Sequence, residues 1–523
     1  ADLTAAGRKG VLVNAMYDYW TPGRHYQSYH GGLRILSESA SVRIATPVDI
    51  DPARISSQGT GYSPRESSWN HLEPWLGGRW TLADIVTDQF IAMESLLDTA
   101  AVRREMFLRG FHDIQRRAAS RTSPYAFVIP PAQADPGAAR RLLETMDFAM
   151  VEVERAAAPF AAGGREFPAG AYVIRMQQPY SSFAKTLLER QKYPDLRQYP
   201  GGPPKRPYDV TAHTLPLLLG VSVETISAPF EAKLERVREF RFAERGLAAS
   251  DSDSWRAVTR AWREQRPVYR NPRSGDFATG ARPPAEFTPL KEPRVAVYKP
   301  FVPSMDEGWT RWILEHFGWR YTSAGNADIR AGRLRERFDV IVFADMSANV
   351  IESGHSRGSM PEEFTGGLGA EGAAALKEFL AGGGRLIFFN HSGEYAVRQL
   401  GIDVRNAVSG VPSREFYCPG SLLNVRLDAS SPLAFGLPAD FTLWNETSPV
   451  WESQNGAGAS VVRYAPQNVL ASGWLLGETH LAGKPALLDV PVGPGRVVLF
   501  GFRPQYRGQS WLTLKLFFNA LVL

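Results

Sequence analysis

The sequence predicts an α/β protein divided into several domains, and three observations support this prediction. Residues 121–228 and 294–523 each alternate short apolar strands with helical patterns, as in sheets that are covered by helices. A charged, Pro-rich stretch, 229–293, separates them. The length of 523 residues favours about three domains. We therefore divide the chain into residues 1–120 and these three stretches.

Composition limits the classes of partner. Hydrophobic residues make up 44% of the chain and charged residues 22%, which is ordinary for a globular protein. The net charge is only +5, and no dense Lys/Arg block carries interleaved aromatics, so we expect no nucleic-acid partner. No run approaches the roughly 20 apolar residues of a membrane span. The single cysteine, Cys418, excludes an internal disulfide.

The first stretch begins with a predicted strand, 8–15, and a loop rich in Tyr, His and Gly, 17–32. The long segment 46–80 follows, and its tryptophans either line a substrate cleft or anchor the segment to its own domain: Trp69, Trp75 and Trp80. Thr81 then begins a helix that runs to about residue 119 or breaks near Gly110.

Glu38 is the one carboxylate inside the apolar run that follows the loop, between Leu36 and Ala40. It is either a surface carboxylate paired with Arg34 or Arg43, or a general base. In the second case, partial removal from water raises the pKa of the carboxyl group toward working pH, so that it can take a proton from a nucleophilic water.

The stretch 10–47, GVLVNAMYDYWTPGRHYQSYHGGLRILSESASVRIATP, resembles the last part of the catalytic domain of the zinc metallocarboxypeptidase (carboxypeptidase A-like) family in large secreted bacterial proteins. The resemblance implies that Glu38 is the general base that activates a zinc-bound water. It also implies that Tyr26 or Tyr29 closes over a peptide substrate, with Arg24 and His30 beside them as substrate-binding residues. It further implies zinc as the cofactor and an extracellular or periplasmic location.

One departure from that family concerns the metal. The family holds zinc with an H-x-x-E motif and a third histidine upstream of the catalytic glutamate, whereas only His25 and His30 precede Glu38 here. We therefore expect the zinc ligands upstream of this chain, in a missing N-terminal half or on a separate chain, and no metal site in residues 1–120, which we interpret as the end of a carboxypeptidase-like α/β domain.

The central stretch, 121–228, predicts a small α/β module with parallel pairing. Its strands are YAFVIP, MVEVERA and GAYVIRM, and its helices are 136–146 and 180–191. A Pro-rich connector that holds the lone His213 ends the module. The linker 229–293 predicts two helices, at 229–241 and 252–264.

The final stretch, 294–523, predicts a doubly wound, flavodoxin-like domain. Strands RVAVYKP, FDVIVFAD and GGGRLIFFN alternate with helices 306–317 and 370–381, and VPVGPGRVVLFGF predicts a hairpin. This order resembles class I glutamine amidotransferase-like domains, which place a nucleophilic cysteine on the turn after a central strand. The corresponding turn here, 390–393, is Asn-His-Ser-Gly, so we expect the domain to lack the nucleophile.

Two short motifs in this domain match known ligand-binding patterns. Gly367–Gly372 fits G-x-G-x-x-G, but the preceding strand ends well before it, which favours a glycine-rich entry to a helix. His391 and Glu394 form an H-x-x-E at the carboxyl end of a strand, where α/β sheets place ligands. A zinc site needs a third protein ligand, for which only His480 or a carboxylate remains downstream.

Three functions follow from these patterns. The favoured one is part of a zinc carboxypeptidase-like enzyme, in which this chain supplies Glu38 and lacks the metal-binding half. The alternative is a non-catalytic binding or assembly module that recognises a partner, a glycan or a cell-surface component. The third, a glutamine-dependent transferase, would depend on Cys418.

Overall fold

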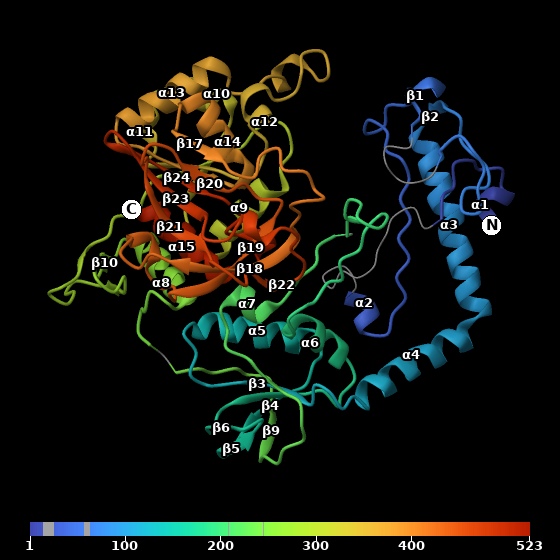
Figure 1. Cartoon of the computed structure of the whole chain (residues 1–523), viewed down its shortest axis with the longest axis horizontal. Helices are drawn as coiled ribbons and strands as arrows, with labels where there is room; N and C mark the ends of the chain where they lie inside the picture. Colours follow the sequence, from blue (N-terminus) through green and yellow to red (C-terminus); the bar gives the residue numbers. More distant parts are fainter. Residues whose placement is uncertain (14–25, 57–62, 208, 244) are drawn as a thin grey trace. The chain divides into compact units, whose positions relative to one another are not determined.

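The computed structural model describes residues 1–13, 26–56, 63–207, 209–243 and 245–523 (Figure 1). They form two compact units. The first consists of Ala1–Arg121, Gln177–Phe183 and Arg206–Asp209, and the second of Thr122–Met176, Ala184–Lys205 and Val210–Leu523. The predicted α/β class is correct for the second unit, as described below.

The first unit contains mainly helices and extended loops. Its elements are α1 (Asp2–Ala5), α2 (Tyr26–Tyr29), β1 (Val48–Ile50), η2 (Pro52–Arg54), β2 (Gly78–Trp80), α3 (Leu82–Val102) and α4 (Arg104–Ala119). Strands β1 and β2 pair antiparallel. Thr81 and Asp84 form the capping box that begins α3, and the helical run is interrupted at Arg103 rather than near Gly110. The described residues of the predicted strand 8–15 join no sheet, because only Gly10 and Val13 donate backbone hydrogen bonds to a neighbouring segment.

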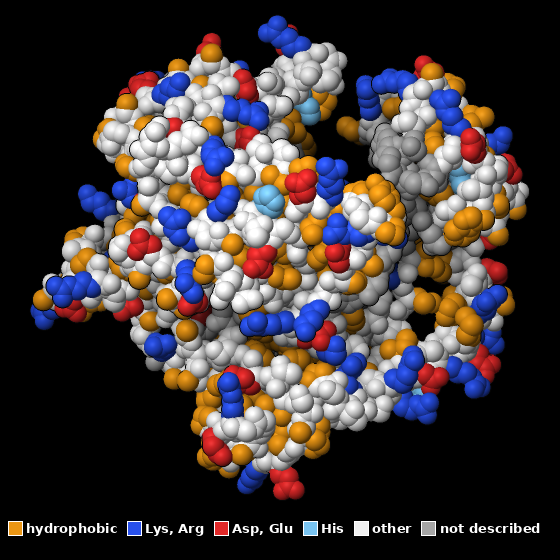
Figure 2. All heavy atoms as spheres, viewed as in Figure 1, with side chains coloured by type: hydrophobic (Ala, Val, Ile, Leu, Met, Phe, Trp, Pro, Cys, Tyr) orange, Lys and Arg blue, Asp and Glu red, His pale blue; other side chains and the backbone are white. Residues whose placement is uncertain are grey.

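None of the helices in the described part of the chain is long and apolar enough to cross a membrane. The space-filling view shows Lys, Arg, Asp and Glu side chains interspersed over the visible face, without one large patch of a single sign (Figure 2).

The central part of the second unit is a sheet of order β8-β3-β7-β4-β9. Its strands are β3 (Ala126–Ile129), β4 (Val153–Ala156), β7 (Tyr172–Arg175), β8 (Glu224–Ile226) and β9 (Leu234–Val237). The other elements here are α5 (Pro136–Phe148), the hairpin β5 (Phe160–Ala162) with β6 (Arg165–Phe167), α7 (Leu215–Leu219) and the part of α6 (Ser181–Leu188) that begins at Ala184.

Two predictions for this region are wrong. The strands pair antiparallel rather than parallel, because β7 lies between β3 and β4, the two strands that α5 connects. The stretch 229–241 contains β9 instead of a helix, since it adds to the sheet beside β4. The second predicted linker helix is present as α8 (Ser252–Arg263). The strands β10 (Val268–Arg270), β11 (Phe277–Thr279) and β12 (Thr288–Pro289) follow it.

The C-terminal part is built on parallel strands in the order β14-β13-β15-β16-β24. They are β13 (Val295–Tyr298), β14 (Tyr321–Ala324), β15 (Val340–Phe343), β16 (Arg385–Phe389) and β24 (Gly495–Phe500). All neighbouring pairs among them are parallel. Numbered along the chain, the order is 2-1-3-4-5, which is the flavodoxin-like order, so this prediction is confirmed.

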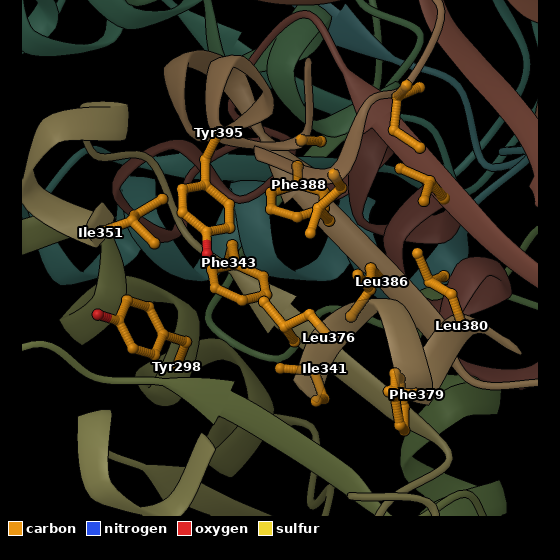
Figure 3. Packing of buried hydrophobic residues seen from close by; sticks show 14 of the residues in the cluster. Tyr298, Ile341, Phe343, Ile351, Leu376, Phe379, Leu380, Leu386, Phe388 and Tyr395 are labelled. Atoms are coloured by element: carbon orange, nitrogen blue, oxygen red, sulfur yellow. The ribbon is translucent and has the colours of Figure 1, made fainter. Parts of the chain in front are cut away.

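Helices cover both faces of this sheet. They are α9 (Met305–His316), α10 (Asn326–Arg330), α11 (Leu334–Arg337), α12 (Ala348–Ser353), α13 (Gly369–Ala381), α14 (Gly393–Tyr395) and α15 (Trp511–Val522). Leu376 and Phe379 of α13 pack with Leu386 and Phe388 of β16 in one core (Figure 3). Phe517 of α15 contacts the opposite face of β16, with its ring centroid 5.0 Å from that of Phe389.

An antiparallel extension, β24-β23-β21-β18-β19, continues the sheet beyond the parallel part. Its strands are β18 (Pro419–Leu427), β19 (Asp440–Glu446), β21 (Ala459–Tyr464), β22 (Leu470–Ser472) and β23 (Pro485–Val492), and β17 (Val404–Asn406) pairs separately with β20 (Trp451–Ser453). Strands β23 and β24 form the predicted hairpin.

A buried ion pair joins α15 to α5. Lys515 Nζ lies 2.7 Å from Asp135 Oδ2, and both side chains are 3% exposed. Asp135 also accepts hydrogen bonds from the backbone N–H groups of Ala138 and Ser252. We expect Lys515→Met to lower the free energy of unfolding by about 3–5 kcal/mol, because it leaves a buried carboxylate without its counter-charge.

Urea unfolding measures this loss, with Lys377→Met on the exposed side of α13 as the control, for which a change within about 0.5 kcal/mol is expected. Equal stability of the two variants would contradict the assigned role of the pair.

Candidate ligand-binding site at the carboxyl edge of the parallel sheet

Charged side chains gather where the parallel strands end. Asp345 follows β15, His391 follows β16 and Arg503 follows β24, while Asp306 lies in the first turn of α9 after β13. Glu446, the last residue of β19, joins them. Because parallel strands share one carboxyl edge, residues far apart in the sequence meet there.

Arg503 is at the centre of this group. Its Nη1 lies 3.2 Å from Asp306 Oδ2 and its Nε lies 3.9 Å from Asp345 Oδ2, while Nη2 pairs with Glu446. Burial would lower the pKa of Arg503, but the three carboxylates raise it above its ordinary value. Arg503 is therefore a permanent buried cation. Burial raises the pKa of Asp306, against the opposing effect of Arg503.

Asp345 and His391 form a second, coupled pair. The Asp345 carboxylate accepts hydrogen bonds from Asn390 Nδ2 (2.9 Å) and from the backbone N–H of His391 (3.1 Å), and its Oδ1 lies 3.2 Å from His391 Nδ1. His391 Nε2 lies 3.1 Å from the carbonyl oxygen of Thr447. Burial would lower the pKa of His391, but the hydrogen bond and charge of Asp345 raise it. Burial would raise the pKa of Asp345, but His391 lowers it.

The backbone on both sides of His391 is unusual. Asn390 and Thr447 have φ angles of 54° and 49°. A positive φ is rare for a β-branched residue such as Thr, and such conformations cluster at functional sites. The turn after β16 is also where the amidotransferase resemblance would place a cysteine, and here residues 390–393 are Asn-His-Ser-Gly.

A cavity of about 350 Å³ opens beside this pair. It is lined by Asp345, Met346, Ser347, Ala348, Asn349, His391, Glu394 and Arg398. Arg398 Nη2 donates to Glu394 Oε2 (2.9 Å) and Nη1 donates to Asn349 Oδ1 (3.3 Å). The cavity thus combines two carboxylates with a guanidinium, an imidazole and an amide, which is a set of hydrogen-bond donors and acceptors of nearly balanced charge.

The residues predicted from the carboxypeptidase resemblance lie in the first unit. Glu38 is exposed in a segment without regular structure, so the removal from water that would make it a general base is absent. His30 stacks on Tyr26, with 4.3 Å between ring centroids, and its Nδ1 lies 2.8 Å from the carbonyl oxygen of Tyr26. Tyr29 is the last residue of α2, and Arg24 lies outside the described residues.

The three tryptophans of segment 46–80, which the sequence predicts either to line a cleft or to anchor the segment, lie in different surroundings. Trp75 and Trp80 contact each other, with 6.0 Å between ring centroids, and Trp80 Nε1 donates to the carbonyl oxygen of Ala40. Trp69 is 80% exposed. Trp75 also lines a hollow of the first unit together with His71 and Arg43.

The His, Cys, Asp and Glu side chains bear on metal and thiol chemistry. Across the ranges that the structure describes, no three His, Cys, Asp or Glu side chains are arranged to hold a metal ion. In the H-x-x-E motif, His391 contacts Asp345 and Glu394 accepts from Arg398. Cys418 is fully buried, and burial raises the pKa of its thiol to about 12, so it is not a thiolate nucleophile at neutral pH.

No protein-family model and no curated protein matches the chain. Several solved structures are similar to part of this chain. A protein described as ThuA-like from Bacteroides uniformis is 13% identical over 46% of this chain and 96% of its own, with a TM-score of 0.28. A glutamine amidotransferase from Thermotoga maritima is 11% identical over 43% and 82%, with a TM-score of 0.27. A β-galactosidase from Bacillus circulans is 12% identical over 44% and 31%, with a TM-score of 0.26.

The prediction that the chain belongs to the zinc metallocarboxypeptidase family is wrong, and so is its description as a metallopeptidase. The solved structures that resemble it are ThuA-like, amidotransferase and glycosidase proteins rather than carboxypeptidases. The described residues of the first unit contain no carboxypeptidase-like α/β sheet, only the β1–β2 pair. Zinc, a peptide substrate, a separate N-terminal partner chain and a periplasmic or extracellular location followed from that resemblance and stay untested predictions.

Sequence reasoning identified His391 and Glu394 but missed Asp306, Asp345, Glu446 and Arg503. A signal was present for Asp345, since it is the polar residue that ends the strand sequence FDVIVFAD. Arg503 and Glu446 carried no comparable signal, because their role depends on which strand ends meet.

The raised pKa of His391 predicts how its contribution to stability changes with pH. The interaction with Asp345 is fully present below the unfolded pKa of about 6.5 and is lost as pH rises through the higher folded pKa. His391→Gln should therefore cost more stability at about pH 5.5 than at about pH 8.5.

Urea unfolding of wild type and variant at both pH values measures the difference. The exposed His112, replaced by Gln, is the control. A cost of His391→Gln that grows with pH would contradict the assigned pair.

Proposed function

We propose that this chain is a non-catalytic binding module whose C-terminal part binds a hydroxyl-rich ligand, such as the end of a glycan, at the carboxyl edge of its parallel sheet. The observation that carries the proposal is the cavity of about 350 Å³ lined by Asp345, His391, Glu394 and Arg398.

The position of the cavity supports ligand binding. In open α/β sheets, ligands bind outside the carboxyl ends of the strands, at the point where the strand order reverses. Here the chain runs from β13 outward to β14 and returns to β15, so this point lies between β13 and β15. Asp345 lies two residues after β15 at this edge, and the cavity volume is within the range typical of small-molecule sites.

The lining indicates the chemistry of the ligand. A hydroxyl group both donates and accepts hydrogen bonds, and it therefore matches a site that offers carboxylate acceptors together with guanidinium and amide donors. Since the charges of Glu394 and Arg398 offset one another, the site favours a neutral polyhydroxylated molecule over a strongly charged one.

The same residues argue against catalysis at this edge. The turn after β16, residues 390–393, has no cysteine, and the hydroxyl of Ser392 in this turn donates to the backbone carbonyl oxygens of Phe343 and Phe389. Both ring nitrogens of His391 have partners, and the hydroxyl of Ser347 accepts a hydrogen bond from Val350 N as the cap of α12. Among the residues that line the cavity, a nucleophile paired with a free base is therefore absent.

Isothermal titration calorimetry with methyl glycosides of common hexoses tests the proposal. We expect at least one of them to bind wild-type protein, and Glu394→Ala to weaken that binding by about tenfold, because it removes an acceptor and releases Arg398.

Glu452→Ala is the matched control. The Glu452 side chain is 23% exposed, against 26% for Glu394, and it is also paired with an arginine, Arg405, but it lies outside the cavity. The proposal fails if none of the methyl glycosides binds, or if both glutamate variants bind equally well.

A further inference from the structure

An aromatic pair stands exposed at the same edge of the sheet as the cavity. Phe301 and Phe364 are 46% and 43% exposed, and their rings meet edge to face with 5.3 Å between centroids. Met305 and Met360, on the same two segments, are 80% and 46% exposed. We call Phe301 and Phe364 the aromatic platform. Large apolar side chains that gather at one exposed place mark binding surfaces more often than isolated ones do.

The platform is attached to the strand ends beside the cavity. Phe301 lies between β13 and α9, in the loop that also carries Ser304, and Ser304 Oγ donates a hydrogen bond to the carbonyl oxygen of Asp345 (3.1 Å). Strands β13 and β15 are neighbours in the sheet, so their ends are about 5 Å apart. The loop that carries Phe301 therefore lies next to Asp345, which lines the cavity.

Phe364 is held at this edge by its own segment. It ends η3 (Glu362–Phe364), and the nearby Gly366 donates its N–H to the carbonyl oxygen of His355 (2.9 Å). Asn326, which follows β14, donates from Nδ2 to the carbonyl oxygen of Gly366 (3.0 Å). The two rings thus come from separate connections that are each hydrogen-bonded to the carboxyl edge.

This inference rests on the proposed function and extends it to the class of ligand. We propose that the ligand carries a flat apolar face next to its hydroxyl-rich end, and that this face stacks on one ring of the Phe301–Phe364 pair, against the edge of the other, while the hydroxyl groups occupy the cavity. Exposed aromatic rings gain free energy when a second flat apolar surface removes water from them. Two sources share this chemistry: an aromatic aglycone, and the C–H face of a second sugar ring.

The test compares phenyl, methyl and disaccharide glycosides of one sugar by calorimetry. We expect the phenyl glycoside or the disaccharide to bind wild-type protein about five- to tenfold more tightly than the methyl glycoside. Which of the two gains affinity identifies the source of the apolar face. Phe301→Ala and Phe364→Ala should each reduce the ratio of this affinity to that of the methyl glycoside toward one.

Phe148→Ala is the control, since Phe148 is 82% exposed at the end of α5 and the ratio should stay at its wild-type value. A wild-type ratio near one, with the methyl glycoside still bound, overturns the platform and leaves the proposed function standing. A ratio that survives both platform substitutions also overturns it. If none of the glycosides binds, the proposed function fails and the platform fails with it.

Discussion

The buried guanidinium of Arg503 fixes the carboxyl edge of the sheet. It pairs with Asp306, Asp345 and Glu446, which lie after β13, after β15 and at the end of β19. Each of these carboxylates would be costly to bury without a counter-charge, so removing Arg503 would destabilise the edge where these segments meet. Asp345 in turn sets the position of His391, and through it one wall of the cavity.

This arrangement favours recognition. Polar groups that are already held by hydrogen bonds lose little freedom when a ligand arrives, and such preorganisation strengthens binding. Asp345 and His391 are held in this way, and Arg398, which is half exposed, is held by Glu394 and Asn349. A lining whose polar groups are already in place suits a small polar molecule that enters from solvent.

The sequence was sufficient for the flavodoxin-like strands, because VAVY, VIVF and RLIFF are short apolar runs that are buried on both faces. It was insufficient for β9, whose alternating charged residues are stable as a strand only beside β4. The candidate site likewise contains residues that the sequence could indicate and residues that it could not. His391 could be found from its place after a strand, but Arg503 and Glu446 are brought together only by folding. The resemblance of residues 10–47 led instead to Glu38, which is exposed.

Methionine-methyl NMR of the whole chain tests the central claim most directly. The chain has nine methionines, and one of them, Met346, lines the cavity. Titration with a hydroxyl-rich glycoside should shift the Met346 methyl signal and leave Met93 and Met106, on α3 and α4 of the first unit, unchanged. Shifts confined to Met93 and Met106, or no shift at Met346 when the ligand is bound, would contradict binding at the carboxyl edge.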